Sequence, residues 1–146
     1  METTFKKVHT VKDLAISSLV IIAGIVFFFL NKGAGTVLAV VGVLMILVYK
    51  GGYKADGEGS VLSKKSLDLC KCCKQSLMEY LDGKDTVPEV KEGHEGGSIR
   101  LDIFFNRTSG IAYAKLYDYS NYTYEPLTQT VKLTPPASAK LLNQIA

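Results

Sequence analysis

The feature that most constrains this chain is a window of 36 residues, 14–49, that carries a single charged side chain, Lys32. Lys32 divides the window into two apolar segments of 17 residues each, 14–30 and 33–49. As α-helices, these segments would each be about 25 Å long, near the thickness of a bilayer's hydrocarbon core. Because only residues 31–32 separate them, they predict a tight antiparallel transmembrane hairpin.

A cleaved signal peptide and a buried core hairpin both fit this window less well. A signal peptide would have a small-x-small site after a short apolar core, but here a second apolar segment follows at once. A buried hairpin inside a soluble protein would need more covering chain than the remaining residues supply. The sequence therefore favours insertion into a lipid bilayer.

Lysines are unevenly distributed around the predicted hairpin. Its tip, residues 31–32, carries one lysine, whereas the basic N-terminal segment 1–13 and the segment after residue 49 carry several. The lysines at these two open ends are Lys6, Lys7, Lys12, Lys50 and Lys54. Since positive charge marks the cytoplasmic side, we expect a multi-pass protein of the plasma or inner membrane with both termini in the cytoplasm.

Small residues recur at helical spacing within the two apolar segments. They are Ser17 and Gly24 in the first segment, and Gly35, Ala39 and Gly42 in the second. Small side chains let two helix backbones approach closely in lipid, so these residues are candidates for helix–helix packing. The alternative is that they only reflect a composition rich in glycine and alanine.

The rest of the chain predicts a glycine-rich flexible linker, residues 50–62, followed by a small cytoplasmic α+β domain, residues 63–146. We expect this domain to contain a helix, a three-stranded antiparallel meander and a C-terminal helix. The first helix is predicted over 64–82, because apolar residues recur there every three or four positions. These residues are Leu67, Cys70, Cys73, Leu77 and Leu81.

The predicted meander begins with residues 98–106, where apolar and polar side chains alternate. A turn at 107–110 would pair Asn106 with Ile111, which places an apolar residue opposite an apolar residue along one face. A second turn around Ser120 and Asn121 would pair Tyr119 with Tyr122 and make the third strand an edge, because Pro126 cannot donate a hydrogen bond. The final helix is predicted to follow Thr134 as its N-cap.

The other face of this predicted sheet is rich in aromatic and charged side chains. The expected pairing brings Phe104 beside Tyr113, Lys115 beside Asp102, and Arg100 beside Tyr117. Surfaces that bind proteins favour tyrosine, phenylalanine and arginine. The candidate partner-binding residues are Arg100, Phe104, Tyr113, Lys115, Tyr117, Tyr119, Tyr122 and Tyr124. The alternative is an aromatic ladder that only stabilises the sheet.

Three cysteines lie within four positions, Cys70, Cys72 and Cys73. Together with His94 they are weak candidates for a metal or redox site, because structural zinc sites prefer pairs of cysteines in turns. Cys70 and Cys73 fall on the predicted buried stripe, where a small apolar side chain is the simpler interpretation. Acylation of Cys72 is a second option.

No phosphate-binding glycine loop, metalloprotease motif or nucleophile elbow is present in the sequence. The domain is nearly neutral, which argues against binding nucleic acid. We therefore expect no cofactor, and a role as a membrane-anchored binding or scaffold module, with the bilayer and either a protein partner or a second copy of the chain as partners. The alternative is a small membrane enzyme or redox protein that uses the three cysteines.

Overall fold

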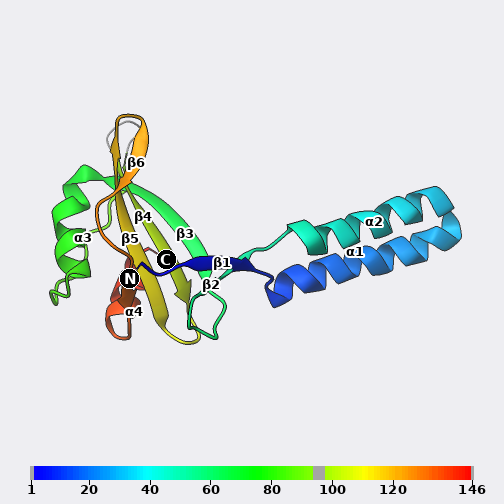
Figure 1. Cartoon of the computed structure of the whole chain (residues 1–146), viewed down its shortest axis with the longest axis horizontal. Coiled ribbons are helices and arrows are strands. Elements are labelled where there is room, and N and C mark those ends of the chain that lie inside the picture. Colours follow the sequence, from blue (N-terminus) through cyan, green and yellow to red (C-terminus); the bar gives the residue numbers. More distant parts are fainter. Residues whose placement is uncertain (1, 94–97, 146) are drawn as a thin grey trace. The chain divides into compact units, whose positions relative to one another are not determined.

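The chain folds into two compact units, seen here in a computed structural model that describes residues 2–93 and 98–145 (Figure 1). The first, which we call the helical unit, comprises residues 5–61. The second, the α+β unit, combines residues 2–4 with residue 62 and the chain that follows it. Within the described residues they contain four α-helices and two antiparallel sheets.

The helical unit is built on two antiparallel helices, α1 (Val11–Leu30) and α2 (Lys32–Val48). A single residue separates them. Asn31 ends α1 by donating its backbone N–H to the Phe27 carbonyl, and its side-chain oxygen accepts the N–H groups of Gly33 and Ala34 at the start of α2. One asparagine thus caps both helices, which explains how so short a link reverses the chain.

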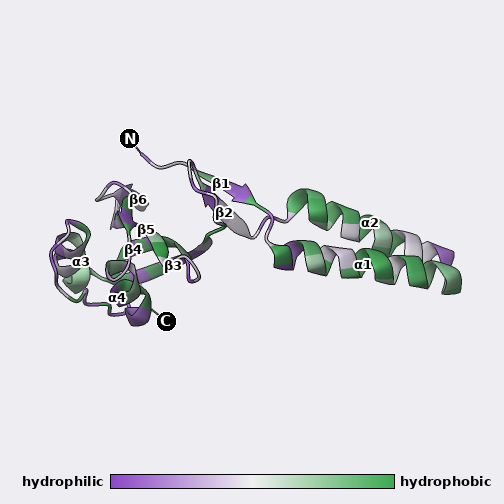
Figure 2. Cartoon of the chain, turned by 90° about the horizontal axis from the view of Figure 1, so that it is seen from below, coloured by the Kyte–Doolittle hydropathy of each residue, from purple (hydrophilic) through white to green (hydrophobic). Residues whose placement is uncertain are grey.

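Of the helices in the described part of the chain, α1 alone is both long and apolar enough to cross a membrane, at 20 residues. The shorter α2 is equally apolar but has 17 residues. Figure 2 shows hydrophobic residues along most of both helices. Helix α2 begins one residue before its predicted start at residue 33, and α1 begins three residues before its predicted start at residue 14. The earlier start of α1 follows from Thr10, which forms a capping box with Asp13.

A two-stranded ribbon continues from the open end of the hairpin. Its strands are β1 (Phe5–Val8) and β2 (Gly52–Ala55), paired antiparallel with Val8 opposite Gly52. The prediction of a flexible linker over 50–62 is therefore wrong for the four residues of β2. Strands this short carry no readable pattern; they pair because the helices bring the two chain segments together.

The α+β unit contains one antiparallel sheet in the order β3–β4–β5–β6, with β7 also paired to β5. Strands β6 and β7 pair with different ends of β5, so they lie in line along the same side of it. The five strands are β3 (Ser63–Cys70), β4 (Ser98–Asn106), β5 (Ile111–Ser120), β6 (Thr123–Pro126) and β7 (Val131–Leu133).

One face of this sheet forms the core of the α+β unit with α3 (Lys74–Leu81) and α4 (Ala137–Gln144) (Figure 2). The alternating positions of β4 and β5 supply its centre, which is fully buried, and the Tyr80 hydroxyl donates to the Ala137 carbonyl to join the helices. The core side chains from the strands include Leu69, Ile99, Leu101, Ile103, Ala112, Ala114, Leu116 and Leu133.

The predicted helix over 64–82 is wrong in its first half. Residues Ser63–Cys70 form strand β3, a single 3-10 turn follows at Lys71–Cys73, and only Lys74–Leu81 is α-helical. The stripe that suggested a helix joins Leu67 of the strand to Leu77 and Leu81 of the helix. The same segment also has the alternation of a strand, with Leu67 and Leu69 on one side.

The strand pairing agrees with prediction in its first half and differs in its second. Asn106 pairs with Ile111 and Gly110 ends the turn at a φ of +69°, as expected. The second turn instead has Asn121 and Tyr122 at its centre, so Tyr119 pairs with Tyr124, a shift of two residues. This shift leaves every side chain on its predicted face, and β6 is the predicted edge strand.

The last helix begins later than predicted. Pro136, not Thr134, is the residue before α4, and the Thr134 carbonyl accepts the Ser138 N–H. The Ser138 hydroxyl, buried in the unit, donates to the Gly110 carbonyl at 2.5 Å and ties α4 to the turn between β4 and β5. Tertiary contacts therefore decide where this helix starts.

Candidate binding face

The face of the sheet that lies opposite α3 and α4 is the candidate binding face. The structure brings seven of the eight predicted partner-binding residues onto it, because they alternate with the core residues along β4, β5 and β6. These seven are Arg100, Phe104, Tyr113, Lys115, Tyr117, Tyr119 and Tyr124, of which Tyr113 is buried, at 4 % exposure. Strand β3, predicted as helix, adds Lys64, Ser66 and Asp68 to the same face, and β7 adds Lys132.

The most connected part of this face is a cluster around Arg100. Its guanidinium lies 4.1 Å from the centre of the Tyr124 ring, and its Nε is 3.3 Å from an Asp68 carboxylate oxygen. The Tyr124 hydroxyl donates to the same oxygen at 3.1 Å, and the Tyr119 ring lies 5.0 Å from the Tyr124 ring. The cation is thus held between a carboxylate and an aromatic face, which fixes it in position.

A second set of cation–aromatic contacts runs along the same face. Lys64 forms a 2.9 Å ion pair with Asp102 and lies over the Phe104 ring. Lys115 lies over the Tyr117 ring and forms an ion pair with Glu2, from the N-terminal residues of the same unit. That contact raises the pKa of the Lys115 amine and lowers the pKa of the Glu2 carboxyl. Both groups are therefore charged at neutral pH.

Tyr122, the eighth predicted residue, is not on the face but at its end, in the turn between β5 and β6. Its side chain is 92 % exposed. Asn121 and Tyr122 have φ values of +50° and +62°, as in the type I′ turns that join hairpin strands. Asparagine tolerates this backbone, whereas a tyrosine there is uncommon and strained.

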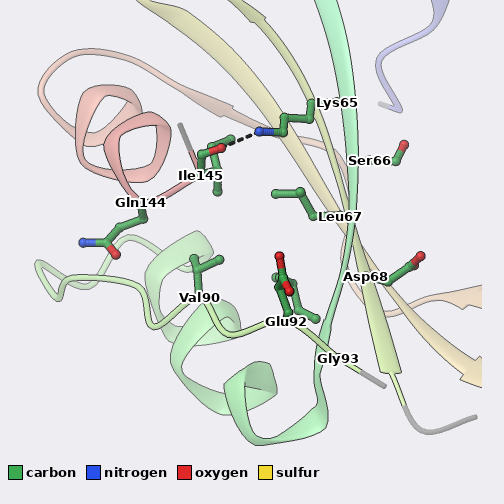
Figure 3. A pocket seen from close by; sticks show the side chains of 10 residues that line it. Lys65, Ser66, Leu67, Asp68, Val90, Glu92, Gly93, Gln144 and Ile145 are labelled. Carbon is green, nitrogen blue, oxygen red and sulfur yellow. Dashed lines mark hydrogen bonds between the residues drawn. The ribbon is translucent and has the colours of Figure 1, made fainter. Parts of the chain in front are cut away.

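A cavity of about 530 Å³ opens beside the edge of β3 that faces away from β4 (Figure 3). Its wall combines Lys65 and Leu67 of β3 with Val90 and Glu92 of the following loop and Ile145 at the end of α4. The Lys65 amine donates to the Ile145 carbonyl at 2.5 Å. This cavity was not predicted, because the residues of β3 were assigned to a helix. Its described lining mixes apolar side chains with Lys65, Asp68 and Glu92, which suits polar or extended ligands.

The loop that borders the cavity forms backbone hydrogen bonds with one end of β3. Cys70 donates its N–H to the Lys91 carbonyl at 2.9 Å, and Gly93 donates to the Asp68 carbonyl at 3.1 Å. Along residues 64–67, no strand of the described chain pairs with this edge. An edge with two lysines, Lys64 and Lys65, is protected against aggregation by their charge.

The three cysteines form a tight turn at the start of α3. Cys73 is fully buried, Cys70 is half-buried and Cys72 is exposed. The Cys70 sulfur accepts the Cys72 N–H at 3.2 Å, and the Cys72 and Cys73 sulfurs are 3.8 Å apart. Among the residues described, no three His, Cys, Asp or Glu side chains are arranged to hold a metal ion, and His94 lies outside the described residues.

These contacts shift the pKa values of the Cys70 and Cys72 thiols in opposite directions. Hydrogen bonds from Cys72 lower the pKa of Cys70, whereas the neighbouring sulfurs and burial raise the pKa of Cys72 to about 11. The turn is also anchored by Asp118 of β5, which lies 2.9 Å from Lys74 and 3.7 Å from Lys71. The arrangement resembles a hydrogen-bonded structural turn more than a nucleophile with a base.

The predicted helix-packing residues lie where α1 and α2 touch. Ser17, Gly24, Gly35 and Gly42 are buried in the unit. A Cβ atom added to Gly35 would lie 2.2 Å from the Phe28 backbone nitrogen, and one added to Gly24 would lie 2.5 Å from the nitrogen of Ala39. Both distances are far below van der Waals contact, so this closeness of the backbones requires glycine.

Comparison with known proteins gives no further guide to function. No protein-family model matches this sequence, and neither a curated protein nor a solved structure matches it. A function for this chain is therefore inferred from the chemistry of its own residues.

Proposed function

We propose that this protein is a membrane-anchored binding module. In this proposal α1 and α2 insert together as a transmembrane hairpin, and the α+β unit presents its candidate binding face to a protein partner at the cytoplasmic surface. The function is binding rather than catalysis. Membrane insertion and partner binding are supported by different observations.

Membrane insertion is supported by the outward surfaces of the hairpin. Large apolar side chains are exposed around both helices, such as Phe29 at 84 %, Leu30 at 79 % and Val48 at 80 %. Each such side chain left in water forgoes about 1.5–3 kcal/mol of transfer free energy. An apolar surface this continuous is typical of helices surrounded by lipid. The 17 residues of α2 extend to the hydrated interface through Tyr49 and Lys50.

Partner binding is supported chiefly by Tyr122. This large aromatic side chain is almost fully exposed, and its backbone adopts a left-handed conformation that is unfavourable for tyrosine. Non-glycine residues in strained backbone conformations cluster at functional sites, so the φ of Tyr122 supports a functional role. Tyr119 and Tyr124 lie on the adjoining end of the face, so the three rings supply the aromatic anchors that dominate many interfaces.

Photo-crosslinking in intact membranes tests this proposal. We would place p-benzoylphenylalanine at Tyr119, Tyr122 or Tyr124 of the full chain, with Val87, an exposed loop residue of the same unit, as the control position. The expected result is the same adduct from all three tyrosine positions and none from Val87. A mass equal to two chains would identify a second copy as the partner. Absence of an adduct, or an equal yield from Val87, would contradict the proposed face.

A further inference from the structure

We propose that the open end of the hairpin binds anionic phospholipid headgroups through a lysine collar. The collar consists of Lys6, Lys7, Lys12, Lys50 and Lys54, all in the helical unit. This inference depends on the proposed insertion of the hairpin, and it adds the chemical class of lipid that the protein selects. It is supported by the placement of these lysines and by the finding that, among the described residues, four of the five have no carboxylate partner.

The ribbon places two lysines directly opposite each other. In the pairing of β1 with β2, Lys6 lies across from Lys54, and both side chains are exposed. Like charges at directly opposite positions of an antiparallel pair destabilise the ribbon. An anion bound between the two amines would remove this repulsion. Lys7, on the other side of the ribbon, is also exposed.

Two more lysines are brought together at the helix ends. The Asp13 carboxylate accepts the Gly51 N–H at 2.9 Å, which ties the start of α1 to the end of α2. Lys12 directly precedes Asp13 in the sequence, and Lys50 directly precedes Gly51. Lys12 also lies in the first turn of α1, where the helix dipole disfavours a cation. Its charge is therefore better compensated by an external anion.

The carboxylates of the helical unit do not neutralise the collar. Asp13 is buried, and one of its carboxylate oxygens accepts the N–H groups of both Thr10 and Gly51. Asp56 lies 3.7 Å from the Lys6 amine, an exposed and weak ion pair. In the part of the chain that the structure describes, the other four collar lysines have no carboxylate within ion-pair distance.

The position of the collar selects a lipid headgroup rather than another anion. Lys12 and Lys50 are directly at the ends of the apolar helices, in the layer of about 5–8 Å that headgroups occupy on each side of the hydrocarbon core. Lys6 and Lys54 lie on the ribbon that continues from these helix ends. At the opposite end of the hairpin the tip carries only Lys32.

The test uses the full chain reconstituted into vesicles and the electron spin resonance of spin-labelled lipids. We expect labelled phosphatidylglycerol to associate with the protein at least about threefold more strongly than labelled phosphatidylcholine. The ratio should fall towards one in about 1 M NaCl, because salt screens exposed charges. It should also fall when all five collar lysines become glutamine.

The matched controls are Lys32→Gln at the hairpin tip and the pair Lys84→Gln and Lys91→Gln in the α+β unit; both should keep the selectivity of the unmodified chain. Circular dichroism establishes that each variant retains its helices. An equal association of the two lipids, or a selectivity that survives the five substitutions, would overturn the inference.

Failure of the inference is separable from failure of the proposed function. Flotation of neutral phosphatidylcholine vesicles after alkaline carbonate treatment reports insertion without reference to charge. A chain that floats with these vesicles yet shows no lipid selectivity would refute the collar and leave the hairpin intact. A chain stripped from them by carbonate would refute membrane insertion and, with it, the collar.

Discussion

Tyr122 occupies a turn position that glycine would fill with less strain, since its φ is +62° and its side chain is almost fully exposed. We predict that Tyr122→Gly stabilises the α+β unit by about 1 kcal/mol, because the residue no longer adopts the left-handed conformation against its preference. Chemical denaturation of the detergent-solubilised chain measures this change. The same substitution should abolish the cross-links formed at Tyr119.

Tyr122→Asn serves as the control, because asparagine also tolerates the left-handed conformation but lacks the ring. It should be at least as stable as the natural chain and should lose the adduct. A destabilised Tyr122→Gly chain would show that Tyr122 is a structural residue, and partner binding would lose its principal support.

The exposed Cys72 is predicted to be a slow nucleophile despite its accessibility. With a pKa of about 11, about one thiol in a thousand is ionised at pH 8, whereas the Cys70 pKa is lowered by hydrogen bonds from Cys72. Iodoacetamide should therefore modify Cys72 slowly at pH 8, with a rate that rises about tenfold for each pH unit up to its pKa. Peptide mass spectrometry locates the modified residue. Rapid labelling of Cys72 at pH 7 would contradict this prediction.

At the scale of elements, the prediction from sequence succeeded where a local turn fixes the arrangement. Gly110 at positive φ closes the first hairpin, and the pairing of β4 with β5 follows from it. It failed for β3, because the chain turns from strand to helix at Cys70 and the leucines on either side happen to repeat at helical spacing. Only the pairing of residues 63–70 with β4, which is distant in sequence, shows that they form a strand and not a helix.

The candidate face was predictable for the same reason. Alternation along β4 and β5 places Arg100 and Tyr117 on one side whatever the fine register, and the two-residue shift at β6 preserves that side. The contribution of β3 was not predictable, so Asp68, which holds Arg100, was missed. The cavity beside β3 was missed with it.

The contact between α1 and α2 gives a prediction about packing. Gly35→Ala should weaken the hairpin by about 1–3 kcal/mol, because the new methyl group would lie 2.2 Å from the Phe28 nitrogen and must separate the backbones. The control is Gly33→Ala, where the nearest atom is the Asn31 side-chain oxygen at 3.5 Å. Thermal unfolding of α1 and α2 in detergent micelles, followed by circular dichroism, compares the two. Equal stability would contradict the close approach.

Asp118 joins β5 to the start of α3 through Lys71 and Lys74. A hydrogen bond from Lys74 lowers the pKa of this carboxyl below its ordinary value of 3.8. The stabilisation is therefore fully present above pH 3.8 and is lost as the pH falls through the lower, folded-state pKa. We predict that Asp118→Asn costs at most about 1 kcal/mol at pH 7, because these groups are partly exposed.

Chemical denaturation of the natural chain and of Asp118→Asn, at pH 7 and at pH 2.5, measures how the stabilisation by Asp118 depends on pH. The difference between the natural chain and Asp118→Asn should shrink at the lower pH. A difference that is equal at both pH values would show that the carboxylate charge contributes nothing and that asparagine disturbs packing instead.

At the scale of the whole molecule, the chain combines an apolar hairpin with a small α+β unit whose residues 2–4 come from the other end of the sequence. The helical unit is inserted in the sequence between those residues and the remainder of the α+β unit. Hydropathy and the spacing of apolar residues predicted both parts, but not this interruption, since residues 2–4 show no pattern that links them to Lys115. Long-range contacts of this kind depend on the folded unit.

The proposed function requires that α1 and α2 cross the bilayer as a hairpin. The sharpest test is labelling of single cysteines in intact cells by a membrane-impermeant maleimide, after Cys70→Ser, Cys72→Ser and Cys73→Ala. Lys32→Cys at the tip should react from outside, and Ser109→Cys in the turn after β4 should react only once the membrane is permeabilised. Reaction of both positions from the same side of an intact membrane would contradict the hairpin.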